Sequence, residues 1–267
     1  MNSRNVDWSE RTAGYTEEMT NPYHQHRMKV LVSLLPELRQ GMRILDFGCG
    51  EGAFLPLLIE AGAEVLACDK EEKMIDQVRR RLIESAMPLP GQNLKAAGVE
   101  YLAEIPSDSL DGVLAFNVIA YFTPEEEHEF YSQLRRIVKR GGFLAVSHSN
   151  MLFDFFSLNR YTLQFFQNHL VLGGQYAAAV ESLLARTDLP AGDKALPLPV
   201  RENPLTYALK LKGYGFAETR QEFINRHEAP PPVLQQQTFP DTLAVPEHER
   251  WKLLFTCSQF ASLALRQ

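Results

Sequence analysis

The chain of 267 residues contains few cysteines and no long apolar run. Its three cysteines, Cys49, Cys68 and Cys257, show neither the spacing of metal ligands nor a disulfide framework, so we expect buried, reduced thiols and no metal site. No apolar stretch approaches the length of a membrane span, and the polar residues 1–15 are not typical of a signal peptide. These absences predict a cytoplasmic protein without a membrane span.

Positive charge is also scarce and scattered. The net charge is −6, the isoelectric point is near 5.7, and no long basic run is present. The densest basic cluster, Arg79–Arg81, stands beside acidic residues in a predicted helix, which is typical of a solvated surface. This composition disfavours nucleic acid as the main partner. The hydrophobic fraction of 45% is enough for the core of one large α/β domain, or of a domain with an insertion.

The most informative feature that is present is a glycine-rich turn. An apolar run ends at Asp46, then Gly48, Gly50 and Gly52 follow at alternate positions, and a helical pattern begins at Ala53. The glycines permit positive φ angles and leave no Cβ between the backbone and a ligand. The helix that starts there directs free N–H groups into the same gap. A small molecule carrying a carboxylate or hydroxyls could therefore lie directly on this turn.

The spacing of the turn distinguishes two classes of ligand. Dinucleotide-binding turns have the form Gly-x-Gly-x-x-Gly, and Ala53 stands at their third glycine position, where alanine is tolerated. The carboxylate of Asp46 would repel a pyrophosphate and attract an ammonium group. The pattern Asp-x-Gly-x-Gly-x-Gly resembles the first motif of the class I S-adenosylmethionine-dependent methyltransferases. A turn that merely connects a strand to a helix is the alternative.

This resemblance implies a Rossmann-like fold and S-adenosylmethionine as the cofactor, with S-adenosylhomocysteine as the product. It places Asp46 near the ammonium group of the methionine part. It also places the backbones of Gly48 and Gly50, with Cys49 between them and Gly52 after them, against the amino-acid part of the cofactor.

A second acid, Asp69, ends the predicted strand at residues 64–68, roughly 20 residues after the glycine turn. An open α/β sheet places an acid there to accept hydrogen bonds from both ribose hydroxyls. Because methyltransferases and NAD enzymes share this device, Asp69 indicates adenosine binding without identifying the cofactor. We include the neighbouring Lys70 in the predicted site. Asp69 could instead, or also, cap the helix that starts near Glu71.

Alternation of strands and helices predicts a doubly wound, seven-stranded and mostly parallel sheet. The resemblance implies that the last strand lies antiparallel beside the fifth. The predicted strands are residues 43–46, 64–68, 94–97, 110–116, 143–147, 216–224 and 254–264, and the predicted helices are 24–38, 53–60, 71–86, 124–139 and 204–211. We expect four parts: N-terminal lid helices over 1–40, an S-adenosylmethionine-binding core over 41–150, a helical cap over 151–201, and the C-terminal part of the core sheet over 202–267.

Ligands of open α/β sheets bind beyond the carboxyl ends of the strands. In the family, an acid after the third strand meets the adenine amino group, but Val99 stands at that position here and Glu100 follows one step later. Either Glu100 or the backbone of Val99 would then contact the adenine. Asn117 follows the fourth strand, which ends at Phe116, and the family places this position beneath the sulfonium or near the methyl acceptor. Phe116 is included among the expected cofactor contacts. The alternative is that both residues only end a core strand.

Methyl transfer requires the protein to align the nucleophile, exclude water and manage one proton. A side chain with a pKa near neutrality suits the last task, and His148, at the end of the fifth strand, is the leading candidate for a catalytic base. It could instead be a polar residue that ends the strand or caps the next helix. His24 and His26, in the segment that often covers the cofactor in this fold, are further candidates.

Several aromatic and basic residues are candidates for ligand contacts. The hydroxyl of Tyr15 could close over the methionine carboxylate, and the ring of Tyr23 lies in the same segment; ordinary packing explains both equally well. Tyr121 follows the fourth strand and is included among the acceptor-binding residues. Arg160, in the aromatic-rich cap, could anchor a carboxylate or phosphate of the acceptor, or could form a surface salt bridge.

Together these features predict an S-adenosylmethionine-dependent methyltransferase acting on a small molecule, more at oxygen than at nitrogen. The cap suggests a bounded acceptor such as a sugar derivative, a phenolic metabolite or a natural-product intermediate, and the protein would be a monomer or a homodimer. The alternatives are an N-methyltransferase, a catalytically inactive nucleoside-binding regulator of the same fold, a nicotinamide-dependent oxidoreductase or an aminopropyl transferase. The last two would need a Tyr-x-x-x-Lys set or an acidic polyamine channel, and neither is evident.

Overall fold

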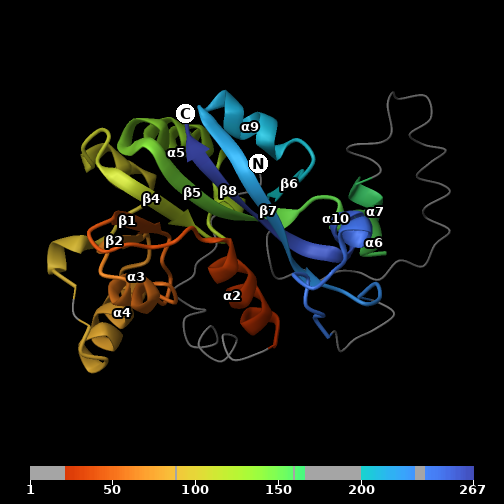
Figure 1. Cartoon of the computed structure of the whole chain (residues 1–267), viewed down its shortest axis with the longest axis horizontal. Helices are drawn as coiled ribbons and strands as arrows, with labels where there is room; N and C mark the ends of the chain where they lie inside the picture. The colour runs from red at the N-terminus through yellow and green to blue at the C-terminus, as the bar shows by residue number, and fades with distance from the viewer. Residues whose placement is uncertain (1–21, 88, 159, 166–199, 232–237) are drawn as a thin grey trace.

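Strands form where apolar residues alternate or run together, and helices form where they recur at helical spacing. The computed structural model describes residues 22–87, 89–158, 160–165, 200–231 and 238–267. Within these residues the sheet has eight strands, in the order β3-β2-β1-β4-β5-β8-β7, with β6 beside β5 (Figure 1). The strands are β1 Arg43–Phe47, β2 Glu64–Asp69, β3 Leu94–Ala96, β4 Leu110–Ala115, β5 Val138–Asn150, β6 Arg201–Glu202, β7 Phe216–Arg226 and β8 Cys257–Arg266.

The direction of the strands confirms the predicted topology. Strands β1 to β6 pair in parallel, whereas β8 runs antiparallel to both β5 and β7. The α-helices are α2 Pro22–Leu34, α3 Leu55–Glu60, α4 Glu72–Glu84, α5 Pro124–Ile137, α6 Phe153–Phe156, α7 Arg160–Phe165, α9 Tyr207–Gly213 and α10 Leu253–Thr256. The 3₁₀-helices are η2 Gly91–Asn93, η3 Val99–Glu104, η4 Ile119–Tyr121 and η6 Glu247–Lys252. The fold is the doubly wound, Rossmann-like sheet expected from the sequence.

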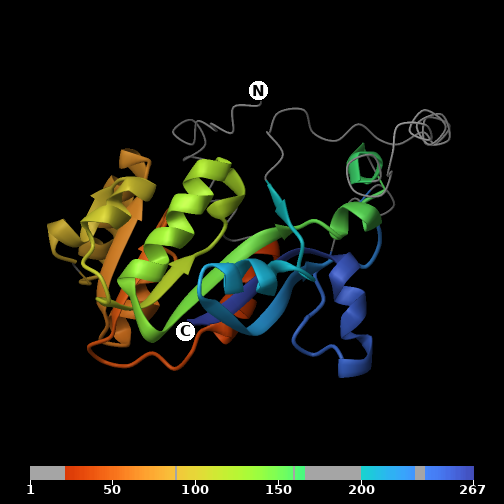
Figure 2. The same ribbon diagram turned by 90° about the horizontal axis from the view of Figure 1, so that it is seen from above.

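Two apolar cores cover the two faces of the sheet, because successive side chains of a strand point to opposite faces. Helices α5 and α9 pack on one face, around Phe130 and Tyr207, and helices α2, α3 and α4 pack on the other, around Leu31, Leu58 and Val78. Figure 1 shows the first group above the sheet and the second below it, and Figure 2 shows α5 and α9 in front of the strands. We call these the α9 face and the α2 face.

Some predicted element boundaries were wrong for identifiable reasons. Helix α2 ends at Leu34 instead of residue 38, because the residue before Pro36 disfavours helical backbone. Strand β5 begins at Val138 and runs through two glycines, with a shift of register opposite β4. The strand β6 lies at the end of a segment that was expected to contain no strand. Helix α5 begins after Thr123, whose side chain forms a capping box with Glu126.

Parts of the predicted lid and cap lie outside the described residues, namely 1–21 and 166–199. The described cap helices α6 and α7 lie at the opposite end of the molecule from β1 to β3 in both views. All three cysteines are buried free thiols, as predicted. Within the described residues, no helix is long and apolar enough to cross a membrane.

Candidate cofactor site

Asp46 brings a carboxylate to the α2 face near the carboxyl end of β1. The residue is 3% exposed, and among the described residues its Oδ2 atom has no hydrogen-bond partner. Burial, with a smaller contribution from the nearby Asp69, raises the pKa of Asp46 to about 7. A buried carboxylate without a partner is costly, so this position suits a ligand that brings a cation.

The turn after β1 is held by the end of β2. The N–H groups of Gly48 and Cys49 both donate to the carbonyl oxygen of Cys68, at 2.8 and 2.9 Å. Gly48 has a φ of +70°, and a Cβ built on it would lie 2.2 Å from the side chain of Val118. Gly50 has a φ of +51°, and nothing lies within 4 Å of the Cβ position there. Packing therefore requires glycine at 48, whereas Gly50 leaves its backbone open to a ligand.

Asp69 fixes the other side of the same turn. Its carboxylate accepts the N–H of Gly50 at 2.9 Å and the N–H of Glu71 at 3.0 Å. Burial raises its pKa, and these two hydrogen bonds oppose the increase. Glu71, and not Asp69, is the N-cap residue of α4, but Asp69 still binds its backbone. Each carboxylate oxygen can accept a further hydrogen bond, so the same side chain can hold the turn and meet hydroxyl groups.

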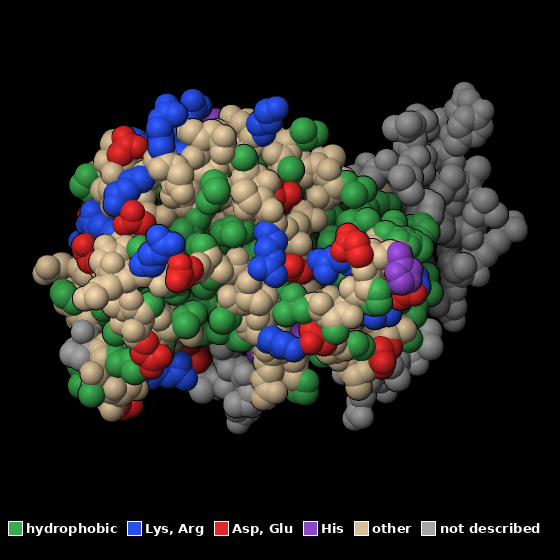
Figure 3. Space-filling model, in the orientation of Figure 1, with side chains coloured by type: hydrophobic (Ala, Val, Ile, Leu, Met, Phe, Trp, Pro, Cys, Tyr) green, Lys and Arg blue, Asp and Glu red, His purple; other side chains and the backbone are tan. Residues whose placement is uncertain are grey.

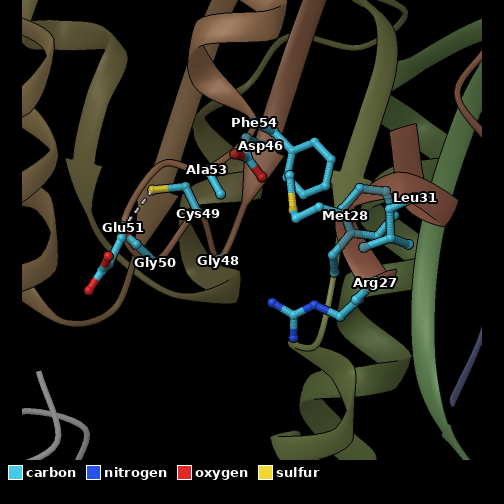
Figure 4. A pocket seen from close by; sticks show the side chains of 11 residues that line it. Arg27, Met28, Leu31, Asp46, Gly48, Cys49, Gly50, Glu51, Ala53 and Phe54 are labelled. Atoms are coloured by element: carbon cyan, nitrogen blue, oxygen red, sulfur yellow. Dashed lines mark hydrogen bonds between the residues drawn. The ribbon is translucent and has the colours of Figure 1, made fainter. Parts of the chain in front are cut away.

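A cavity of about 50 Å³ lies between the glycine turn, α2 and the end of β4 (Figure 4). A volume of this size holds about three or four water molecules, comparable to the amino-acid end of a ligand. A Cβ built on Gly52 would lie 3.0 Å from the side chain of Leu55 and 3.2 Å from that of Val78, so these two side chains pack closely against the turn. The residues around the cavity are Arg27, Met28, Leu31, Asp46, Gly48, Cys49, Gly50, Glu51, Ala53, Phe54 and Phe116.

Arg27 is a site residue that sequence reasoning missed. It lies on α2 and is 7% exposed, its Nε has no hydrogen-bond partner, and its side chain extends towards the glycine turn. Arg27 follows His26 in the predicted lid, and its spacing to Leu31 puts Arg27 and Leu31 on one face of a helix. This spacing is the sequence signal that could have identified Arg27. A cation and a carboxylate on one small cavity fit a ligand that carries an ammonium and a carboxylate together.

A neutral polar cluster lies at the end of β4. Asn117, at a φ of +60°, donates its N–H to Ser147 Oγ at 2.9 Å, and the Ser147 hydroxyl lies 3.2 Å from Asn117 Oδ1. Gln259 Nε2 donates to the same Oδ1 at 3.3 Å, and Gln259 Oε1 is buried without a partner. Gln259 was not among the predicted site residues. The antiparallel β8 brings the start of its strand to the ligand-binding edge of the sheet, opposite Ser149.

The predicted adenine and ribose contacts lie at the ends of β2 and β3. Glu100 is exposed, and its Oε1 accepts the N–H of Gly98 at 2.7 Å, while Val99 is half-buried beside it. Lys70 is exposed next to Asp69. The structure leaves both possibilities for the adenine contact open.

His148 does not lie where a catalytic base is needed. Side chains alternate along β5, so Ser147 faces the α2 face and His148 the α9 face. The His148 ring is 2% exposed and lies 4.4 Å from the ring of Tyr207 and 5.3 Å from that of Phe260. Burial lowers its pKa to about 3. The expectation that His148 accepts a proton from the acceptor is corrected by this placement.

The remaining candidates are only partly placed. Tyr23 packs edge-on against His24 and Phe239, with ring centroids 5.3 and 5.4 Å away, and Tyr121 is half-buried in η4. His24 is buried, which lowers its pKa to about 4 with help from Arg27. Tyr15 lies outside the described residues, as does the side chain of Arg160. The ligand contacts of Tyr15, Tyr23, Tyr121 and Arg160 therefore stay predictions.

Comparison with known proteins is consistent with this geometry. Residues 44–142, which contain Asp46, the glycine turn, Asp69 and Asn117, match the family model described as "Methyltransferase domain". A tRNA U34 carboxymethyltransferase of Idiomarina loihiensis is 34% identical over 110 residues, covering 40% of this chain and 32% of that protein. A ubiquinone biosynthesis O-methyltransferase of Sinorhizobium fredii is 30% identical over 115 residues, covering 43% of this chain and 44% of that protein. The matches thus span less than half the length of these relatives.

The fold is shared over a longer stretch. The crystal structure of an S-adenosylmethionine-dependent methyltransferase from Mesorhizobium loti aligns with a TM-score of 0.57 at 20% identity, covering 92% of this chain and 99% of that chain. Residues 44–142 are thus similar to a methyltransferase domain, and the fold is that of solved S-adenosylmethionine-dependent methyltransferases.

Proposed function

We propose that the chain transfers a methyl group from S-adenosylmethionine to a small-molecule acceptor, at a hydroxyl oxygen. The observation that carries the proposal is the pair Asp46 and Arg27, which border one cavity on the glycine turn and each have a buried polar atom without a partner. This pair matches the ammonium and carboxylate of the methionine part of the cofactor in charge.

Each part of the cofactor has a matching element. Asp46 would hold the ammonium and Arg27 the carboxylate, while the open backbone at Gly50 packs against the amino-acid part. Asp69 would accept hydrogen bonds from the ribose hydroxyls, and Val99 or Glu100 would meet the adenine. The bound cofactor supplies a methyl group activated by sulfonium. Transfer would break the bond between sulfur and the methyl carbon, form the O–CH3 bond and release the hydroxyl proton to solvent. The protein then has to orient the acceptor, limit the access of water and leave a path for this proton.

The neutral cluster at the end of β4 supports a hydroxyl acceptor. Asn117, Ser147 and Gln259 offer amide and hydroxyl groups and no charge, and Gln259 Oε1 lacks a hydrogen-bond donor. A hydroxyl group of the acceptor can donate to this oxygen, which would direct the hydroxyl oxygen towards the transferred methyl group. A sugar derivative, a phenolic metabolite or a natural-product intermediate fits this description, with residues 151–201 as a cap that bounds the acceptor.

A nucleic-acid acceptor is the second candidate, because one of the relatives is named as a tRNA-modifying enzyme. Figure 3 shows Lys and Arg side chains interspersed with Asp and Glu on the face that it displays, and the net charge is −6. This mixture suits a small acceptor better than a polyanion.

The test is calorimetric titration with S-adenosylmethionine and S-adenosylhomocysteine, followed by an assay of S-adenosylhomocysteine release. The acceptors are catechols, sugars, primary amines and bulk tRNA, each supplied separately. We expect binding of both nucleosides and release only with a hydroxyl acceptor. Binding with no release for any acceptor would favour the inactive regulator. Release only with tRNA or with amines would overturn the small hydroxyl acceptor.

A further inference from the structure

Helix α2 is fastened to the C-terminal part of the chain. Within the described residues it contacts β7, β8 and residues 238–242, which we call the C-terminal segment. The rings of Tyr23 and Phe239 are 5.4 Å apart, and Lys29 Nζ lies 2.5 Å from Asp241 Oδ2. At the other end of α2, Arg220 donates to the carbonyl oxygen of Ser33 at 2.7 Å. The helix that carries Arg27 is therefore positioned by residues about 200 places later in the sequence.

His26 makes the most buried of these contacts. Its ring is 9% exposed; Nδ1 lies 3.1 Å from Asn225 Oδ1 and 3.2 Å from the Asn225 N–H nitrogen, and Nε2 lies 3.4 Å from the backbone nitrogen of Thr242. A neutral ring carries one hydrogen. On Nδ1 this hydrogen donates to Asn225 Oδ1 while Nε2 accepts the Thr242 N–H, and on Nε2 it leaves Nδ1 free to accept the Asn225 N–H. Either form joins α2 to β7, and the first also joins it to the C-terminal segment. Burial lowers the pKa of His26, in agreement with a neutral ring.

Both partners of His26 are themselves fixed. Asn225 is completely buried in β7 and has a φ of +57°, and the Thr242 hydroxyl donates to the carbonyl oxygen of Phe223, also in β7, at 2.6 Å. The three residues His26, Asn225 and Thr242 therefore form a buried group that ties three segments together. We call this group the latch.

The latch lies in the N-terminal half of α2, beside Arg27. Val30, Leu31 and Leu34, in the C-terminal half of the helix, belong to the core of the α2 face, and Met28 packs against this core next to Arg27. Arg27 is in the N-terminal half, directly after His26, and no hydrogen bond or ion pair of its guanidinium group is found among the described residues. The direction of the guanidinium therefore depends on where the latch holds that half of the helix.

We propose that His26 is a positioning residue for cofactor binding: the latch holds the N-terminal half of α2 so that Arg27 meets the cofactor carboxylate. Cofactor affinity then depends on the C-terminal segment, although that segment does not border the cavity. The inference rests on the proposed function for the role of Arg27.

The test compares two ligands, S-adenosylhomocysteine and 5′-methylthioadenosine, which has the same nucleoside but no carboxylate or ammonium. By calorimetry, His26→Ala should weaken binding of S-adenosylhomocysteine about tenfold and leave binding of 5′-methylthioadenosine within twofold. His26→Gln, which keeps a donor and an acceptor, should restore most of the affinity. In an Arg27→Gln background, His26→Ala should cause no further loss. The matched control is His128→Ala, at an exposed histidine on α5 that bonds only Tyr214.

An equal loss of affinity for both ligands would show a general structural defect and overturn the proposal. An unchanged affinity of His26→Ala for S-adenosylhomocysteine would also overturn it. So would a further loss of affinity when His26→Ala is added to Arg27→Gln. If His26→Ala does not fold, Asn225→Gly removes the amide partner at a backbone angle that glycine accepts, and the same selective loss is expected. Failure of the unchanged protein to bind S-adenosylhomocysteine would instead reject the proposed function, and the latch with it.

Discussion

Arg27 and Asp46 border the same cavity from α2 and from β1, and each presents a buried polar atom without a partner. Opposite charges that share a site normally pair directly or lie in water. Here the structure describes no ion pair between them. Their arrangement is that of a site prepared for a ligand with both charges, and it gives the first prediction.

Arg27→Gln should weaken the binding of S-adenosylmethionine at least tenfold, because a charge-assisted hydrogen bond to a carboxylate contributes about 1.5–3 kcal/mol. Binding of 5′-methylthioadenosine, which lacks the carboxylate, should not change. Calorimetric titration of both ligands measures the difference. Arg39→Gln is the control, since Arg39 is exposed and pairs with Glu37. Equal weakening of both ligands would contradict the assignment.

Asp46→Asn should separate binding from stability. The pKa of Asp46 is about 7 in the folded protein and 3.8 in an unperturbed carboxyl group, so the folded state holds this proton more tightly. The contribution of the group to the free energy of unfolding is therefore fully present below about pH 4 and is lost as the pH rises through about 7. Without ligand, the free energy of unfolding of the variant should not show this decrease with rising pH. At pH 7.5 the variant should be at least as stable as the original protein.

Urea denaturation of both proteins at pH 5 and pH 7.5 measures this difference. In the same samples, the variant should bind S-adenosylmethionine at least tenfold more weakly, because it can no longer offer a negative charge to the ammonium. A variant that is destabilised at pH 7.5 would mean that the carboxylate has a structural partner.

The core of this site could be predicted from the sequence because it is local. Asp46 and the glycines belong to one turn, and Asp69 ends the next strand, so their roles follow from spacing and from the general geometry of parallel sheets. The parallel sheet followed from the alternation of strands and helices, and the antiparallel last strand from the family resemblance. Arg27 and Gln259 could not be found like this, because their positions depend on how a distant helix and an antiparallel strand pack against the sheet.

His148 was named from the sequence as a site residue, but its side chain points to the other face of the sheet. Its position at the end of β5 was predicted correctly, but a one-residue step along a strand reverses the face to which the side chain points. The sequence does not show which of Ser147 and His148 faces the cavity until the packing of α9 against one face is known. The rings of Tyr207 and Phe260 determine the answer.

Asp69→Ala should weaken the binding of both S-adenosylmethionine and 5′-methylthioadenosine at least tenfold, since both carry the ribose hydroxyls that Asp69 is expected to bind. The structure adds a second cause, because the Gly50 N–H loses its acceptor. Asp69→Asn keeps one acceptor oxygen and should lose less. Unchanged calorimetric affinity for both ligands would mean that the ribose binds elsewhere.

Substitution of two glycines in the turn should have different effects. Gly48→Ala should lower the free energy of unfolding by about 1–3 kcal/mol, since its Cβ would lie 2.2 Å from Val118 at a φ of +70°. Gly50→Ala meets no atom within 4 Å and should cost about 1 kcal/mol for its backbone angle. The larger effect of Gly50→Ala should be a weaker affinity for the cofactor, because the added methyl group would lie on the side of the turn that is open to the ligand. Denaturation and calorimetry on both variants check this, and a reversed order would contradict the description of the turn.

His148→Phe should leave the methyl-transfer rate within about twofold of the original, measured by S-adenosylhomocysteine release with the best acceptor of the panel. The ring lies between two aromatic side chains on the face away from the cavity, and its Nε2 has no partner to lose. Phenylalanine has a similar shape and avoids burying an unsatisfied nitrogen, so thermal stability should be equal or higher. His148→Ala, which leaves a cavity, is the matched control and should lower stability without a specific effect on rate. A fall in rate of a hundredfold or more for the stable phenylalanine variant, the size that removal of a general base produces, would restore His148 to the chemistry.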